Sequence, residues 1–260
     1  MRSRSARLAC SAAGVGAILV LTGCSWVQGE SPPTEPQGTL VVFAAASLAE
    51  TFDQVETKVE RLYPKLDVVM NYGGSAGLAT QIVEGAPADV FVSASAAAME
   101  PIVNAGLTAH PVDLATNSLM IAVPPGNPGG VSTLDDFTRS DLAIALCAVE
   151  VPCGALAERV LDTAGVVASV DSYEQDVTAV LTKLELDEVD AGLVYRTDVL
   201  AAGDRVEGIT FPGADDATTL YQYAVVGSAP NPTAGSAFTM YLRSEWMRDL
   251  LKEAGFGAPE

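Results

Sequence analysis

The chain has 260 residues, 49% of them apolar, and carries a formal net charge of −19. This length allows one or two domains with substantial cores. A surface this acidic repels nucleic acids and anionic membranes, and it repels anionic ligands at long range, so an anion site would have to act through local contacts.

The N-terminus has the pattern of a bacterial export signal. The first 23 residues contain three arginines and no acidic residue, and residues 8–21 form an apolar stretch. That stretch is shorter than the roughly 20 residues that a membrane-spanning helix needs. It ends in Leu-Thr-Gly-Cys, which resembles the lipobox of bacterial lipoproteins and implies cleavage of residues 1–23 and acylation of Cys24. The alternative is an ordinary signal peptide with an incidental cysteine.

A proline-rich segment follows the predicted lipidation site. Residues 24–38 contain three prolines and several polar residues, which predicts a flexible tether. We therefore expect an exported protein, anchored to the outer face of the cell membrane through lipidated Cys24.

Alternating strand and helix patterns begin at residue 39. Buried β-branched runs predict the strands, and amphipathic periodicity predicts the helices between them. Their order favours a largely parallel sheet covered on both faces. The predicted strands are 39–44, 66–72 and 89–93, and the predicted helices are 48–63, 78–84 and 96–105.

Two of these strand-to-helix turns end on a serine, Ser47 and Ser75. Such a turn leaves unpaired backbone N–H groups beside a hydroxyl donor. No lysine or arginine occurs between Leu66 and Thr138, so the pattern predicts a site in which neutral donors hold a small oxyanion. Ser47 also stands three residues before Glu50, a spacing typical of a helix cap, and Ser75 is also compatible with a plain tight turn.

The predicted donor set restricts the protonation state of the ligand. A protonated anion would present an O–H group with no acceptor, so a fully ionised tetrahedral anion is favoured. Such a site would separate dianions such as sulfate or molybdate from phosphate, which carries a proton near neutral pH.

A second α/β set follows after residue 117. Together the two sets fit two lobes of roughly 100 residues each. In such folds ligands bind at the carboxyl ends of the strands, where helices begin. The predicted strands are 118–123, 142–147, 191–195 and 220–226, and the predicted helices begin at 133, 154, 176, 197, 234 and 245.

Two cysteines, Cys147 and Cys153, belong to the predicted folded part, whereas Cys10 lies in the segment expected to be removed. The oxidising environment of an exported protein favours a disulfide between them. Two buried free thiols are the alternative. A metal site is disfavoured, because two cysteines without nearby histidines supply too few ligands.

Several short segments carry a family resemblance. They are Val-Phe-Ala-Ala-Ala-Ser-Leu at 42–48, Gly-Ser-Ala-Gly-Leu-Ala at 74–79, Gly-Ala-Pro-Ala-Asp-Val-Phe-Val-Ser-Ala at 85–94, and residues 150–154, 175–177, 191–195 and 254–256. Together they resemble the molybdate-binding proteins of bacterial ABC importers, over about residues 39–256. The first and third segments are specific in combination.

The resemblance implies an α/β, two-lobed periplasmic-binding-protein-like fold of type II. Each lobe would be a mostly parallel sheet flanked by helices, with the ligand cleft between the lobes. Residues 39–117 and 223–260 would form the first lobe, and residues 118–222 the second.

The resemblance also implies a ligand set without charged side chains. The hydroxyls of Ser47, Ser75 and Tyr195 and the backbone N–H groups of Cys153 and Val177 would bind the anion. Cys153 stands where the family often has alanine. A backbone contact tolerates that change, and a bond to Cys147 would stiffen the loop.

The implied function is capture of molybdate, and of tungstate, by closure of the lobes, followed by delivery to an ABC permease and its ATPase. No cofactor, cation site or nucleic-acid partner is expected, and we expect a monomer without enzymatic activity. A receptor for another small oxyanion such as sulfate is the alternative. A serine hydrolase is a further one, but neither serine lies in a G-x-S-x-G elbow, and the single histidine, His110, lies in a polar loop. Asp89 and Asp176 are expected to be caps or turn residues.

Overall fold

The computed structural model describes residues 35–108, 110–215 and 217–259. They belong to one compact unit, Glu35–Glu260. The predicted signal peptide, the lipidation site Cys24 and most of the predicted tether lie outside the described residues. None of the described helices has both the length and the apolar character that a membrane crossing requires.

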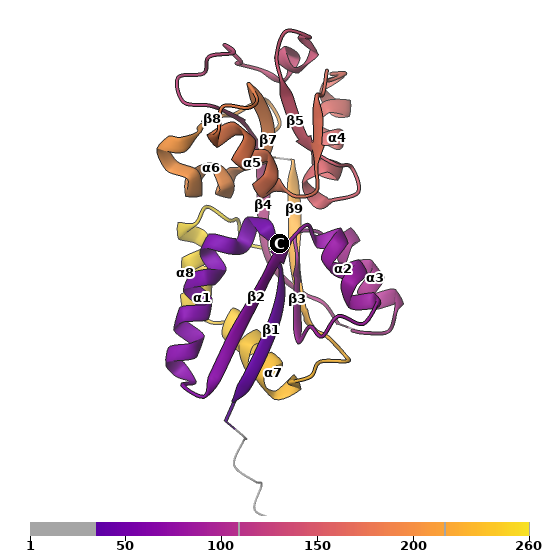
Figure 1. Cartoon of the computed structure of the whole chain (residues 1–260), viewed down its shortest axis with the longest axis vertical. Helices are drawn as coiled ribbons and strands as arrows, with labels where there is room; N and C mark the ends of the chain where they lie inside the picture. The colour runs from indigo at the N-terminus through magenta and orange to yellow at the C-terminus, as the bar shows by residue number, and fades with distance from the viewer. Residues whose placement is uncertain (1–34, 109, 216, 260) are drawn as a thin grey trace, which may run out of the picture. The chain divides into compact units, whose positions relative to one another are not determined.

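The first lobe is built on three parallel strands, with helices on both faces of the sheet (Figure 1). β1 pairs with β2 along its whole length and with β3 on its other side. The apolar side chains form one buried cluster with α1 and a second with α2 and α3. These elements are β1 (Gly38–Ala45), α1 (Ala49–Leu62), β2 (Leu66–Gly73), α2 (Ser75–Val83), β3 (Val90–Ser93) and α3 (Ala96–Asn104).

The second lobe has its own buried cluster, which gathers apolar side chains from Leu119 to Ala214. β5 lies between β6 and β7 and is parallel to both. The elements are β5 (Ile144–Cys147), α4 (Pro152–Ala164), β6 (Ser172–Glu174), α5 (Val177–Glu185), β7 (Ala191–Tyr195), α6 (Arg196–Ala202) and β8 (Glu207–Ile209).

Two strands, β4 (Val112–Val123) and β9 (Thr218–Val225), run between the lobes (Figure 1). β4 pairs antiparallel with β9 through residues 112–118 and with β7 through residues 119–122. β9 also pairs antiparallel with β3. The sheet is therefore mixed: its outer strands are parallel, as predicted, and the strands that pass between the lobes run against their neighbours.

Both crossing strands begin earlier than the sequence pattern indicated. β4 starts at Val112 instead of residue 118, and β9 starts at Thr218 instead of Leu220. Polar residues at these ends weaken the apolar pattern, and the pairing between β4 and β9 supplies the strand structure. Residues 218–222, which we assigned to the second lobe, belong to this pairing.

The C-terminal helices α7 (Pro232–Leu242) and α8 (Glu245–Glu253) pack in the first lobe, in the same buried cluster as α1. The buried Asp89 helps to hold them there. Its carboxylate accepts hydrogen bonds from the N–H of Val41, in β1, and of Asn231, which caps α7. Asp89 thus joins distant segments and is not a helix cap.

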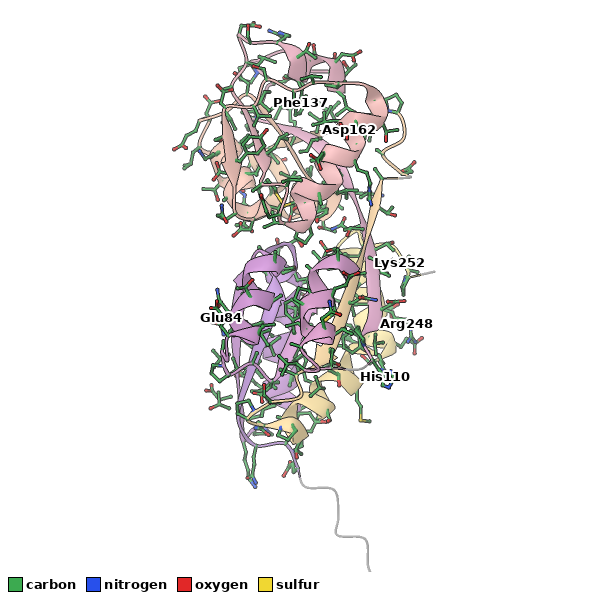
Figure 2. The ribbon with its side chains drawn as sticks, turned by 90° about the vertical axis from the view of Figure 1, so that its right-hand side faces the viewer. Glu84, His110, Phe137, Asp162, Arg248 and Lys252 are labelled. Carbon is green, nitrogen blue, oxygen red and sulfur yellow. A yellow bond between two sulfur atoms is a disulfide. The ribbon has the colours of Figure 1, made fainter. Side chains whose placement is uncertain are left out.

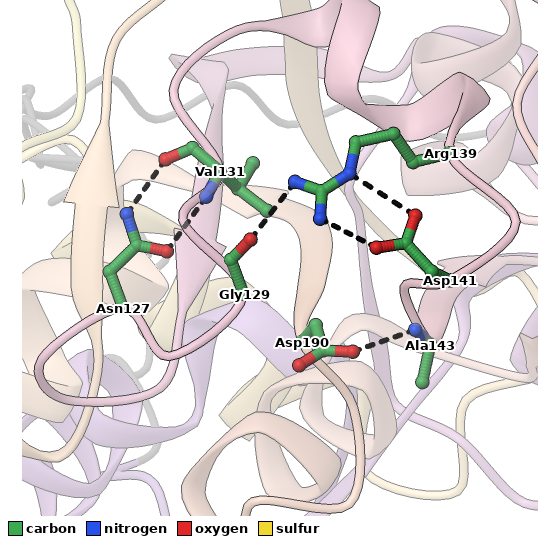
Figure 3. A network of polar contacts seen from close by, with 7 residues as sticks. All are labelled: Asn127, Gly129, Val131, Arg139, Asp141, Ala143 and Asp190. Atoms are coloured by element: carbon green, nitrogen blue, oxygen red, sulfur yellow. Dashed lines mark hydrogen bonds and ion pairs between the residues drawn. The ribbon is translucent and has the colours of Figure 1, made fainter.

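A polar network orders the loop between β4 and β5 (Figure 3). Asn127, at a φ of 47°, accepts from the N–H of Val131 and donates to its carbonyl oxygen. Arg139 forms an ion pair with Asp141 at 2.8 Å and donates to the carbonyl oxygen of Gly129. The Arg139 guanidinium therefore stabilises this loop.

Candidate functional site

The ends of strands from both lobes meet at one small cavity. β1 and β2 reach it from the first lobe, and β5 and β7 lead to it from the second. The cavity is small, which suits one small ligand. Its lining comprises Ala45, Ala46, Ser47, Gly73, Gly74, Ser75, Ala94, Val151, Pro152, Cys153, Asp176, Val177 and Tyr195.

The five residues predicted to bind the ligand all line this cavity. Ser47 and Ser75 come from the first lobe, and Cys153, Val177 and Tyr195 come from the second. The predicted set thus comes together at one place, although its members are spread over most of the described chain.

Three helices begin at the cavity: α2 at Ser75, α4 at Pro152 and α5 at Val177. The start of a helix leaves N–H groups without an intrahelical acceptor and carries the positive end of the helix dipole. Among the described side chains, none caps α2 or α4. At α5, Asp176 accepts from the N–H of Ala179. The N–H groups of Cys153 and Val177 are thus available to a ligand.

The hydroxyl of Ser75 is held as a donor toward the cavity. Ser75 is buried, and its Oγ accepts a hydrogen bond from the N–H of Ala94 at 3.0 Å. A backbone N–H can only donate, so the Ser75 proton is free for another acceptor.

Ser47 lies in the 3₁₀ turn Ala46–Leu48, and its Oγ is 2.6 Å from the hydroxyl oxygen of Tyr221. The prediction that Ser47 caps the following helix is wrong, because no side chain caps this turn or α1. The contact with Tyr221, 174 positions away in the sequence, takes the place of the local cap.

Tyr195 presents a buried hydroxyl with no hydrogen-bond partner among the described residues. Burial, reinforced by the nearby Tyr221 and Asp198, raises the pKa of Tyr195, so the hydroxyl keeps its proton. A buried donor left unpaired is unfavourable unless a ligand accepts its hydrogen bond. The hydroxyl therefore suits an anion in the cavity.

The buried carboxyl of Asp198 belongs to the third residue after Tyr195. It accepts the N–H of Tyr195 at 2.9 Å and so fixes the backbone at the start of α6. Burial raises the pKa of Asp198 to about 8, against the lowering effect of that hydrogen bond. Near neutral pH this carboxyl therefore adds little negative charge.

The polarity of the cavity comes from neutral groups. Among its described lining residues there is no lysine, arginine or histidine, and Asp176 is the one charged residue. The lining offers hydroxyl protons and free N–H groups, which favour an anion without a cationic side chain.

A disulfide joins Cys147, at the end of β5, to Cys153, in the first turn of α4, with the Cα atoms 5.8 Å apart. Both cysteines are buried. The intervening loop is also closely packed, since a side chain at Gly154 would overlap the carbonyl oxygen of Ala148. Both features hold the Cys153 N–H at the cavity.

The lobes touch at Gly74. A Cβ atom there would overlap the carbonyl oxygen of Gln175 and lie 3.3 Å from a methyl group of Val151. Gly74 belongs to the first lobe and its two neighbours to the second, so the absence of a side chain allows the lobes to lie this close together.

The remaining candidates do not join the site. His110 is exposed and does not line the cavity. It lies in the first lobe, on the side of the C-terminal helices (Figure 2). Arg196 is exposed and does not line the cavity either, because it is the first residue of α6. Among the described residues, no cluster of three or more His, Cys, Asp or Glu side chains is suited to a metal ion.

Sequence reasoning missed the groups that support the donors. Three contacts come from distant segments: Tyr221 contacts Ser47, the N–H of Ala94 donates to Ser75, and Asn117 donates to Tyr221. No local spacing signals such contacts. Two of the residues lie on the crossing strands, whose antiparallel pairing the sequence pattern did not predict.

Comparison with known proteins agrees with this architecture. Residues 40–257 match the family of bacterial extracellular solute-binding proteins. The molybdate-binding protein ModA of Mycobacterium tuberculosis is 35% identical over 253 residues, which cover 95% of this chain and 97% of that protein.

Solved structures confirm the predicted fold class. The periplasmic molybdate-binding protein of Azotobacter vinelandii superimposes with a TM-score of 0.74 at 21% identity, covering 85% of this chain and 100% of that one. The sulfate-binding protein SubI of Mycobacterium tuberculosis superimposes with a TM-score of 0.71 at 18% identity, covering 85% and 86%. At such identities the likeness concerns the fold alone.

Proposed function

This chain belongs to the family of bacterial extracellular solute-binding proteins, and we propose that it captures molybdate for an ABC importer. Tungstate, which has nearly the same size and charge, is expected to bind as well. Its relative in Mycobacterium tuberculosis, which shares 35% of its residues over nearly the whole length, carries the name of a molybdate-binding protein.

The observation that carries the proposal is the donor set of the cavity. Five residues, Ser47, Ser75, Cys153, Val177 and Tyr195, line one small cavity. We propose that the hydroxyls of the two serines and the tyrosine and the N–H groups of Cys153 and Val177 donate to the anion. Five neutral donors and three helix starts favour a compact dianion whose oxygens all accept hydrogen bonds.

The one carboxylate in the cavity lining matters for the discrimination between phosphate and molybdate. Asp176 lines the cavity, and its Oδ1 accepts from the N–H of Ala179 within its own helix. We propose that this carboxylate serves as a helix cap only. If Asp176 instead accepted the proton of hydrogen phosphate, the cavity could bind phosphate. The proposal excludes that arrangement.

Capture would proceed by closure of the two lobes. An anion that accepts from both Ser47 and Tyr195 bridges the first and the second lobe, so it stabilises the closed form over an open one. The contact between Gly74 and Gln175 supports such a closure, because it requires the lobes to approach closely.

The cellular setting follows from the family and the N-terminal pattern. We propose that Cys24 is lipidated, that residues 24–38 tether the domain to the outer face of the membrane, and that residues 39–117 with 223–260 and residues 118–222 act as the two moving lobes. The protein would act as a monomer that delivers its ligand to a permease and ATPase, without catalysis.

Titration calorimetry of the purified protein with molybdate, tungstate, sulfate and phosphate tests the proposal. Molybdate and tungstate should bind with similar affinity, sulfate more weakly, and phosphate least. A preference for sulfate would support the alternative receptor. Tightest binding of phosphate would contradict both.

A further inference from the structure

We propose that Tyr221 and Asn117 fix the direction of the Ser47 hydroxyl, so that its proton points to the bound anion. The inference rests on the proposed function and adds two positioning residues that do not line the cavity. Both belong to the strands that run between the lobes, Asn117 to β4 and Tyr221 to β9.

The contact between Ser47 and Tyr221 does not by itself set a direction. The two hydroxyl oxygens are 2.6 Å apart, and either can donate to the other. If Ser47 donated, its single proton would be used inside the protein and its oxygen lone pairs would face the anion. If Tyr221 donates, Ser47 keeps its proton for the ligand.

The orientation of Asn117 decides between these cases. Asn117 is buried, and its Oδ1 accepts from the N–H of Ser118 at 3.0 Å. Because a backbone N–H can only donate, the amide oxygen must occupy that side, and Nδ2 must face the other. Nδ2 then donates to Thr197 Oγ1 at 2.8 Å and to the Tyr221 hydroxyl at 3.4 Å.

Tyr221 therefore accepts from Asn117 and has one proton of its own to place. The Tyr221 side chain is fully buried, and burial raises its pKa, so the hydroxyl stays protonated. By distance and angle its hydrogen-bond partners among the described residues are Ser47 and Asn117. The hydroxyl of the neighbouring Tyr195 makes no hydrogen bond with it. Since Asn117 donates, the Tyr221 proton goes to Ser47, and the Ser47 proton is left for the anion.

The Ser75 hydroxyl is also oriented as a donor, but by a backbone group. Ser75 accepts from the N–H of Ala94, whose direction is fixed by the peptide group itself. Ser47 has no backbone donor on its oxygen among the described residues, and the pair of Tyr221 and Asn117 takes over that role. Both serines thus meet the ligand as donors.

A set of substitutions with molybdate titrations tests the inference. Tyr221→Phe removes the donor to Ser47 and should weaken molybdate binding about tenfold, the effect of one net hydrogen bond. In a Ser47→Ala background the same change should have almost no further effect, since the tyrosine acts through that serine. The control is Tyr223→Phe on the same strand, whose buried hydroxyl accepts from Arg243 and not from the site.

Asn117→Asp reverses the polarity with little change of shape. An aspartate would accept the Tyr221 proton, Tyr221 would then accept from Ser47, and the Ser47 proton would turn away from the anion. Molybdate affinity should fall further than in Tyr221→Phe. The same Asn117→Asp change in a Ser47→Ala background measures the effect of the added negative charge alone, because the serine proton is then absent.

Melting temperatures of each variant without ligand separate positioning from folding. The inference would be overturned if Tyr221→Phe lowered molybdate affinity by the same factor with and without the Ser47 hydroxyl. It would also be overturned if the Tyr223→Phe control lowered the affinity as much as Tyr221→Phe does. Absence of oxyanion binding in the unaltered protein would instead overturn the proposed function.

Discussion

Replacing Tyr195 with phenylalanine should affect folding and binding in opposite directions. The Tyr195 hydroxyl is buried and unpartnered among the described residues, and such a group costs about 1–3 kcal/mol. Phenylalanine keeps the ring, which meets Tyr221 edge-on with the ring centroids 6.1 Å apart. The variant therefore removes the unpaired hydroxyl without opening a cavity.

The two magnitudes follow from this geometry. In a domain of this size 1 kcal/mol shifts the melting temperature by about 2–4 °C, so the ligand-free variant should melt about 2–12 °C higher. With molybdate bound, the loss of a hydrogen bond to a charged oxygen costs about 1.5–3 kcal/mol. That free energy corresponds to an affinity about 10–150-fold weaker.

Two measurements check the prediction: thermal melting without ligand, and calorimetric titration with molybdate. Tyr173→Phe is the matched control, because that side chain is 62% exposed and lies outside the cavity lining. A lower melting temperature together with unchanged affinity would refute the reasoning, since the hydroxyl would then stabilise the fold and not the ligand.

Three further predictions concern lobe contact, the disulfide and pH. Gly74→Ala should weaken molybdate binding by at least about tenfold in calorimetry, since its methyl group blocks closure, whereas Gly77→Ala, with open space around its Cβ, should not. Reduction of the disulfide should lower stability to chemical denaturation by roughly 2–3 kcal/mol and weaken binding, whereas unchanged titrations would argue against a role for the loop. The pKa of Asp198 is about 8 in the folded protein against the ordinary 3.8, so the stability that this group contributes is fully present below pH 3.8 and is lost as pH rises from there to about 8. Asp198→Asn should flatten that fall in unfolding free energy, and an unchanged slope would contradict the prediction.

The fold was predictable where burial alone determines the structure. β1 and β3 are runs of apolar residues buried on both faces, and the helices between them have clear amphipathic periods. β6 and β8 were missed because each has three residues, and such short pairings depend on neighbours far along the chain.

The candidate site divides in the same way. The turns at Ser47 and Ser75 indicated neutral donors from the residues themselves, because the helix starts are local features. Cys153, Val177 and Tyr195 rested on family resemblance, since an amide or a buried tyrosine has no distinctive spacing. The role of Tyr221 could not be predicted from the sequence, because its contact with Ser47 spans 174 positions.

The division of the first lobe between the two ends of the chain has a consequence for biogenesis. β9, α7 and α8 leave the ribosome after the second lobe, and they complete the sheet and the buried cluster of the first lobe. The inserted second lobe has all its own strands earlier in the sequence. A chain truncated before Thr218 would therefore lack half of the strand pair that joins the lobes, and the first lobe can be complete only after β9, α7 and α8 have been synthesised.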